Sequence, residues 1–253
     1  MKSTIRRSQA SRHSSPEVRG LQATTAATTT ESNTTSPAKV SKSERGLDSL
    51  GIFHCCIERA RNLLKIHEAA HGKKAKPEKY LADAHRAAIV LAISALDAFV
   101  RSFVVTRVRT LLANKTATLP ESLGTRIKSF LKDDSLLEAA RKDDLLDRVE
   151  KAFRDDFEKR SFQGTRQITE SLKLVGYDDV FHSVAISAEA NEDTLRQRLD
   201  RFTDRRHAIA HRGDYDLSEN PPREQPITKK DAEDCIKTVS LIAEHVHKLG
   251  LQI

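Results

Sequence analysis

Residues 204–214, DRRHAIAHRGD, bring together side chains that suit chemistry on a phosphate group. Imidazole titrates at about pH 6.5, so it can take up and return a proton at cellular pH. Guanidinium stays charged and offers planar, paired donors to phosphate oxygens. Arg206 and His211, with His207 beside them, are therefore candidates for cleaving an RNA phosphodiester by attack of its own 2′-hydroxyl. Such a reaction requires neither a metal nor a cofactor.

The helix that carries these residues is predicted from the spacing of apolar side chains. Five residues follow the helical spacing i, i+4, i+7, i+11 and i+14 and predict one inward face: Leu195, Leu199, Phe202, Arg206 and Ile209. Asn191 is a good N-cap for this helix, and Gly213 can end it. A permanently charged guanidinium is thus predicted at a core position.

Arg206 and His211 are five residues apart, which is about 140° around an ideal helix. One straight helix would therefore point the two side chains away from each other. Either the helix distorts or ends near residues 210–213, AHRG, or the site is shared between two copies around a twofold axis. We favour the shared site, which predicts a homodimer with a composite active site.

Two stretches resemble the HEPN superfamily of helical ribonucleases. Residues 206–211, RHAIAH, are similar to the R-(N/D/H)-x3-H form of its motif, and residues 91–103, LAISALDAFVRSF, resemble the long helix of its RiboL-PSP branch or a sister branch. The resemblance covers roughly residues 46–250. It implies a dimeric, metal-independent endoribonuclease, commonly a toxin or an abortive-infection effector of antiphage defence, with an antitoxin or another defence partner.

The resemblance also implies a role for each residue of the site. Arg206 would orient the scissile phosphate, His211 would transfer the proton, and His207 would steady the phosphate or a base. Asp97, whose counterpart in the family is usually Glu, would face the motif and pair with Arg206. Such a carboxylate would make the inward guanidinium tolerable, because an isolated buried charge costs several kcal/mol.

Two alternatives to catalysis by this motif stay open. The chain could be a noncatalytic HEPN module that binds RNA or a protein partner. Alternatively, Arg206 and Asp97 could form a core ion pair of purely structural value, with the histidines as spectators. A third alternative is a different enzyme, a zinc hydrolase.

The zinc alternative depends on residues 67–71, HEAAH. His67, Glu68 and His71 match H-E-x-x-H, which on a helix puts two imidazoles on one face with a glutamate base alongside. Gly72 follows the motif at once, and no third ligand has matching spacing. We therefore expect these histidines to continue the apolar face of their helix, and we assign no metal site.

Helical periodicity extends over the whole of residues 46–253, and strand signals are scarce. A first helix ends at Gly72 and has this inward stripe: Leu50, Phe53, Ile57, Ala60, Leu64 and His67. A longer helix runs from about Tyr80 to Leu112 with this stripe: Ile89, Ile93, Leu96, Val100 and Phe103. The sequence predicts an all-α, HEPN-like bundle in which two long antiparallel helices and the last two helices form the core.

The other elements are shorter. A third helix is predicted from Leu136, Leu145, Val149, Phe153 and Phe157. Residues 171–184 are expected to form short pieces with Gly176 as a C-cap. Residues 219–226, ENPPREQP, are expected to form a loop, after which Thr228 and Asp231 start the last helix in the manner of a capping box.

Composition divides the chain into a tail and a domain. Residues 1–45 hold 17 Ser/Thr and carry eight Lys/Arg against three Asp/Glu, a net charge of +5, so we expect a disordered basic tail that adds nonspecific attraction to nucleic acid. Residues 46–253 are nearly neutral. No apolar run approaches the roughly 20 residues that span a bilayer, so no membrane is expected. The three cysteines form no C-x-x-C pair and no secretory segment opens the chain, which favours the reducing cytoplasm.

Overall fold

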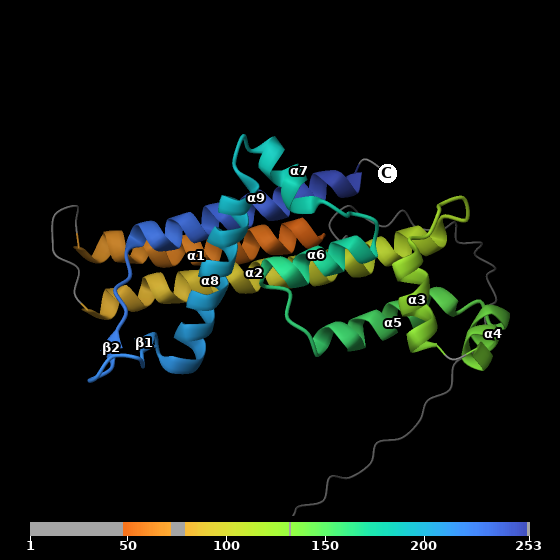
Figure 1. Cartoon of the computed structure of the whole chain (residues 1–253), viewed down its shortest axis with the longest axis horizontal. Helices are drawn as coiled ribbons and strands as arrows, with labels where there is room; N and C mark the ends of the chain where they lie inside the picture. Colours follow the sequence, from red (N-terminus) through yellow and green to blue (C-terminus); the bar gives the residue numbers. More distant parts are fainter. Residues whose placement is uncertain (1–47, 72–78, 132, 252–253) are drawn as a thin grey trace, which may run out of the picture. The chain divides into compact units, whose positions relative to one another are not determined.

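The structure is a computed structural model that describes residues 48–71, 79–131 and 133–251 of the 253-residue chain. These residues all belong to one compact unit, Arg45–Ile253; the predicted tail lies outside them. The regular elements of the described residues are helices apart from one short hairpin, in this order: α1 (Ser49–His71), α2 (Lys79–Ala113), α3 (Glu121–Phe130), α4 (Asp133–Arg141), α5 (Leu145–Glu158), α6 (Thr165–Leu174), α7 (Val180–Ser187), α8 (Glu192–Arg212), β1 (Tyr215–Asp216), β2 (Arg223–Glu224) and α9 (Lys229–Leu251). The predicted all-α fold is confirmed (Figure 1).

Helices α1 and α2 pack side by side and antiparallel, as the sequence predicts (Figure 1). Ser49 Oγ lies 2.7 Å from Ser102 Oγ, and one turn further along α1 the Phe53 ring meets Phe99 at a centroid distance of 5.8 Å. Residue numbers thus rise along one helix while they fall along the other. The predicted inward stripe of α1 is buried at Phe53, Ile57, Ala60 and Leu64.

The long helix α2 is the centre of the domain. It contacts α1, α5, α6, α8 and α9, and its predicted stripe is buried at Ile89, Ile93, Leu96, Val100 and Phe103. Among the described residues, the segment Leu81–Ala113 is long and apolar enough to cross a membrane by length and composition, which the sequence inspection did not anticipate. Most of its apolar window is buried by neighbouring helices, as in the core helix of a soluble domain.

Helices α8 and α9 complete the predicted core. Helix α9 lies along α1 and α2, while α8 crosses α2 and α9 (Figure 1). Asn191 caps α8 by accepting a hydrogen bond from the Thr194 amide at 2.9 Å. Before α9, Thr228 and Asp231 exchange the predicted capping-box hydrogen bonds. These caps satisfy amide groups that the first turn of a helix leaves without partners.

Two predictions about the connecting elements are wrong in part. The third predicted helix is two helices, α4 and α5, because the chain turns between them at Asp143, whose φ is +55°. The expected loop after α8 contains β2, which pairs antiparallel with β1 through Tyr215–Glu224 and Asp216–Arg223. Gly176 follows the end of α6 with φ +93°, in agreement with its predicted role.

Candidate functional site

The motif helix α8 is regular up to Arg212, which removes one of the two explanations for the spacing of the motif. It ends at Gly213, which has the left-handed φ of +59° that favours glycine. The helix does end within residues 210–213, as one explanation expected, but His211 is still helical, so this end does not bring Arg206 toward His211. The two side chains therefore leave different sides of one helix, about 140° apart.

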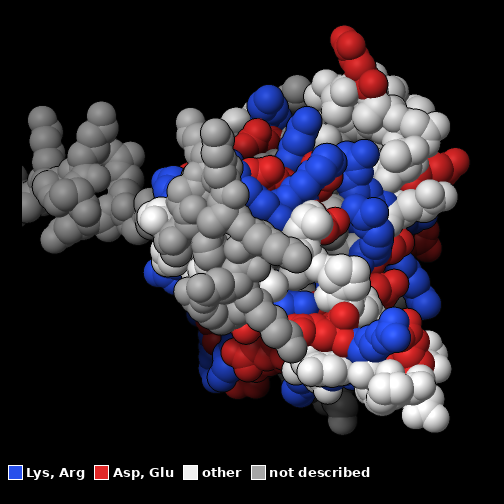
Figure 2. All heavy atoms as spheres, turned by 90° about the vertical axis from the view of Figure 1, so that its left-hand side faces the viewer, with Lys and Arg blue, Asp and Glu red and all other residues white. Residues whose placement is uncertain are grey.

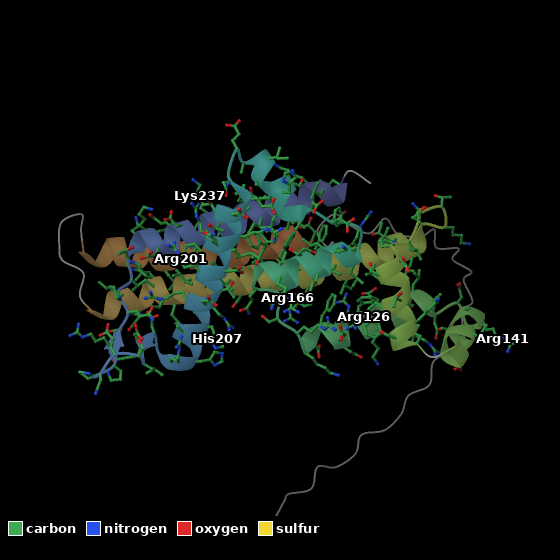
Figure 3. The ribbon with its side chains drawn as sticks, viewed as in Figure 1. Arg126, Arg141, Arg166, Arg201, His207 and Lys237 are labelled. Carbon is green, nitrogen blue, oxygen red and sulfur yellow. The ribbon has the colours of Figure 1, made fainter. Side chains whose placement is uncertain are left out.

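The inward face of α8 is the predicted one, and the motif histidines lie off it. Leu195, Leu199 and Phe202 are buried, and Arg206 is half-buried where their stripe continues. His207 and His211 are exposed, and their ring centroids are 4.4 Å apart (His207 is labelled in Figure 3). The two imidazoles are thus neighbours on an open surface that solvent or a partner can reach.

Arg206 has no ion pair with any described residue, and its buried Nε has no hydrogen-bond partner there. The predicted pair with Asp97 is wrong. Asp97 instead accepts a hydrogen bond from Arg101 Nε at 2.8 Å and another from the Phe162 amide. Arg101 lies one turn along α2, so it reaches the same carboxylate more easily than a residue on α8 can. The purely structural alternative, an Arg206–Asp97 core pair, falls with this prediction.

The neighbouring arginine, Arg205, has the buried partner that sequence analysis sought for Arg206. Asp214 is completely buried, and its Oδ2 accepts hydrogen bonds from Arg205 Nη2 at 2.6 Å and from Arg86 Nε at 2.7 Å. Arg86 also pairs with Glu224 at 3.0 Å and donates to the Gln225 carbonyl at 2.9 Å. We call Arg86, Arg205 and Asp214 the buried arginine network.

This network fixes the end of the motif helix to α2. Burial alone would lower the pKa of Arg86, but the hydrogen bond to Asp214 and the charge of Glu224 outweigh burial and raise it. Asp214 itself has φ +66°, and its amide donates to the Ala208 carbonyl at 3.1 Å. Gln225 donates to the Asp214 carbonyl at 2.9 Å, so the hairpin closes over the helix end.

Sequence reasoning missed this network, although a signal was present. A Gly-Asp pair directly after a helix places a short carboxylate where the chain turns back, and Asp is one of the few residues that tolerate a left-handed conformation. The distant partner Arg86 could not be identified from spacing, because 128 residues separate it from Asp214.

The zinc motif lies at the end of α1, where the side chains of His67, Glu68 and His71 are outside those that the structure describes. Among the side chains that it does describe, no group of three or more His, Cys, Asp or Glu residues could hold a metal ion. The zinc alternative stays a prediction, which metal analysis of the purified protein and of a His67→Ala variant would test.

Comparison with known proteins supports the resemblance noted in the sequence. The family model described as RiboL-PSP-HEPN matches residues 55–249, which include all of α2, α8 and the motif. No curated protein and no solved structure matches the chain. The family match spans more than half of the chain and agrees with its helical bundle. The chain therefore belongs to the RiboL-PSP-HEPN family.

Proposed function

We propose that this protein is a metal-independent endoribonuclease that cleaves RNA by attack of the 2′-hydroxyl. Membership of a HEPN family supports this proposal, since HEPN domains are often ribonucleases. The observation that carries it is that one helix presents an exposed pair, His207 and His211, on one side and, on another side, the guanidinium of Arg206, which has no ion pair among the described residues. These groups can move a proton and stabilise an anion, which are the two requirements of the reaction.

In this proposal the active site forms between two copies of the chain. One regular helix separates Arg206 from His211 by about 140°, so one protomer alone does not point both at the same phosphate. A twofold axis beside α8 would bring Arg206 of one copy toward the exposed imidazoles of the other. Arg206 would then hold the phosphate, His211 would transfer the proton, and His207 would steady the phosphate or a base.

Cleavage of purified RNA in the presence of EDTA tests the reaction. Wild type should produce 2′,3′-cyclic phosphate ends, and His211→Ala should lose cleavage by about 100-fold or more. His54→Ala is the matched control, because His54 is also an exposed helix histidine, on α1, and should cleave like wild type. Activity of His211→Ala equal to wild type would overturn the proposal.

We further propose that the enzyme acts in the cytoplasm as a toxin or antiphage effector, held in check by an antitoxin or another defence partner. Expression of wild type should then arrest growth, whereas Arg206→Ala should not. A noncatalytic HEPN module is the second candidate, favoured by the separation of Arg206 and His211 within one chain. It predicts that wild type and Arg206→Ala are both harmless to cells and that RNA binding persists without cleavage.

A further inference from the structure

Helix α8 carries a row of arginines on a different side from the two motif histidines. Their spacing of three, four and seven residues keeps them within about 60° of one another and extends over about 21 Å. We call these residues the arginine stripe: Arg198, Arg201, Arg205 and Arg212. This length is several times the spacing of successive phosphates along a nucleic-acid strand, so the stripe can follow a nucleic-acid backbone.

Most of the arginine stripe is free to bind an anion. Arg205 is engaged with Asp214, but Arg198, Arg201 and Arg212 are exposed and form no ion pair within the described part of the chain. Lys237 on α9 is also exposed and unpaired there, and it lines the same hollow as Arg198. Figure 3 shows Arg201 and Lys237 where α8 crosses α9.

These cations surround two hollows of the surface. One, of about 840 Å³, contains Arg198 and Lys237. The other, of about 640 Å³, we call the stripe cleft; Arg201, Arg205 and Arg212 line it together with an apolar set, Ile89, Phe202, Ala208, Pro226 and Ile227. Figure 2 looks onto the end of the molecule that carries the start of α9 and the hairpin, and Lys and Arg gather in a band across it.

The carboxylates of the stripe cleft are largely committed to the fold. Asp200 accepts hydrogen bonds from the amide and hydroxyl of Thr165 at 2.9 and 2.7 Å. Asp231 accepts from the amide and hydroxyl of Thr228 at 2.9 and 2.6 Å. Asp204 is the remaining carboxylate that lines the cleft and is exposed. The free cations therefore outnumber the free carboxylates.

The stripe cleft adjoins the candidate active site. Asp204 on its rim is seven residues before His211, which places the two within about 20° of each other on α8. Asp204 is also three residues before His207, a spacing at which helix side chains are neighbours. A ligand in the cleft can thus extend to the imidazoles without crossing the inward face of the helix.

We propose that the free arginines of the stripe, Arg198, Arg201 and Arg212, bind single-stranded RNA together with Lys237, and that the stripe cleft takes one unstacked base next to the phosphate that is cut. A cleft of this volume suits a ligand of nucleotide size, and its mixture of guanidinium planes and apolar side chains suits base stacking. A positively charged groove with stacking surfaces is how proteins hold single strands. This inference rests on the proposed function, because it places the RNA substrate on that site.

Binding to fluorescein-labelled single-stranded RNA, measured by anisotropy in the inactive His211→Ala background, tests the inference. The variant Arg198→Gln/Arg201→Gln/Lys237→Gln should bind about 10- to 100-fold more weakly at about 0.1 M salt, and its log–log salt slope should fall by about 2. Gln keeps the helices intact because its helix propensity is close to that of Arg and Lys. Circular dichroism and thermal unfolding confirm that the variant is folded.

The matched control removes three lysines that are also exposed and unpaired within the described residues: Lys115 in the turn after α2, Lys128 on α3 and Lys151 on α5. Lys115→Gln/Lys128→Gln/Lys151→Gln carries the same change in net charge and should bind within about threefold of its parent. Equal weakening in both variants would mean that only net charge attracts RNA, and it would overturn the inference.

Further outcomes test the ligand class and separate this inference from the proposed function. Duplex RNA should compete poorly for the site; competition as strong as that of the single strand would overturn the base-binding cleft. Stripe-dependent binding to anionic phosphatidylserine vesicles in place of RNA would also overturn it. If wild type cleaves RNA and the stripe variant cleaves and binds equally well, the inference fails and the proposed function stands. If stripe-dependent binding occurs and wild type never cleaves, the proposed function fails instead.

Discussion

Two neighbouring arginines on α8 meet opposite environments. Arg205 donates to the buried carboxylate of Asp214 at 2.6 Å and to two backbone carbonyls of the chain that follows β2. Arg206 continues the inward stripe, yet it has no ion pair with any described residue. The comparison teaches that a buried partner, and not an inward position, separates an arginine that holds the fold from one that has no ion pair among the described residues.

The largest effect should follow removal of the shared carboxylate. Asp214→Ala should lower the free energy of unfolding by about 3 kcal/mol, because it leaves Arg205 without an ion pair and Arg86 with only the more exposed carboxylates of Asp83 and Glu224. Urea unfolding monitored by circular dichroism measures this loss. Asp204→Ala, which removes an exposed carboxylate from the same helix, should unfold close to wild type. Equal losses in the two variants would contradict the assigned role of the buried arginine network.

Exchange of the two arginines for alanine should separate stability from activity. Arg205→Ala should cost about 1–3 kcal/mol of stability, since Asp214 loses one of its two charged donors. Arg206→Ala should unfold nearer to wild type but lose about 100-fold or more of RNA cleavage, as expected for a lost charge-stabilising group. Unfolding and cleavage measured on both variants check this. If Arg206→Ala lost more stability and Arg205→Ala lost more cleavage, the roles assigned to the two side chains would be interchanged.

A smaller effect is expected where α8 turns into the hairpin. Gly213→Ala should destabilise by about 1 kcal/mol, because a Cβ is disfavoured at φ +59°. Gly124→Ala is the matched control on α3, where an added Cβ meets nothing within 4 Å. It should stabilise by about 0.5–1 kcal/mol, since Ala is the better helix former. Thermal unfolding distinguishes the expected destabilisation from the expected stabilisation, and stabilisation by Gly213→Ala would contradict the described turn.

The smallest effect concerns a partly buried histidine away from the motif. Burial and then the charge of Lys248 lower the pKa of His245, whose Nε2 lies 2.9 Å from Ser183 Oγ. Below pH 6.5, the ordinary pKa of histidine, His245 takes up a proton in the unfolded chain but stays neutral in the folded chain until the pH reaches its lowered pKa. Stability therefore falls as the pH drops from 6.5 through the lowered pKa. His245→Gln should flatten this part of the stability profile. An unchanged profile in urea unfolding at several pH values would contradict it.

The sequence predicts the long helices α1, α2, α8 and α9 well, because local signals specify them, whereas it does not predict the short helix α3. The stripes of α1 and α2, the N-cap Asn191 and the C-cap Gly213 each depend on residues within a few turns of one another. The break between α4 and α5 is different. It depends on the left-handed Asp143, which a helical spacing of apolar residues does not reveal.

The site was only partly predictable for the same reason. The exposure of His207 and His211 follows from the face of α8 on which they lie. The partner of an inward arginine, however, depends on contacts between distant segments. Asp97 accepts a hydrogen bond from Arg101, one helical turn away, whereas Asp214 accepts one from Arg86, 128 residues earlier in the chain. Spacing along the chain therefore could not choose between these carboxylates.

The most direct test of the account mixes two inactive variants. Arg206→Ala and His211→Ala, each inactive alone, are combined in equal amounts, allowed to exchange subunits and assayed for RNA cleavage in EDTA. A site built from Arg206 of one copy and His211 of the other leaves one intact site in each mixed dimer, so about a quarter of the wild-type rate should return. No recovery from dimers shown to be mixed would contradict the shared site.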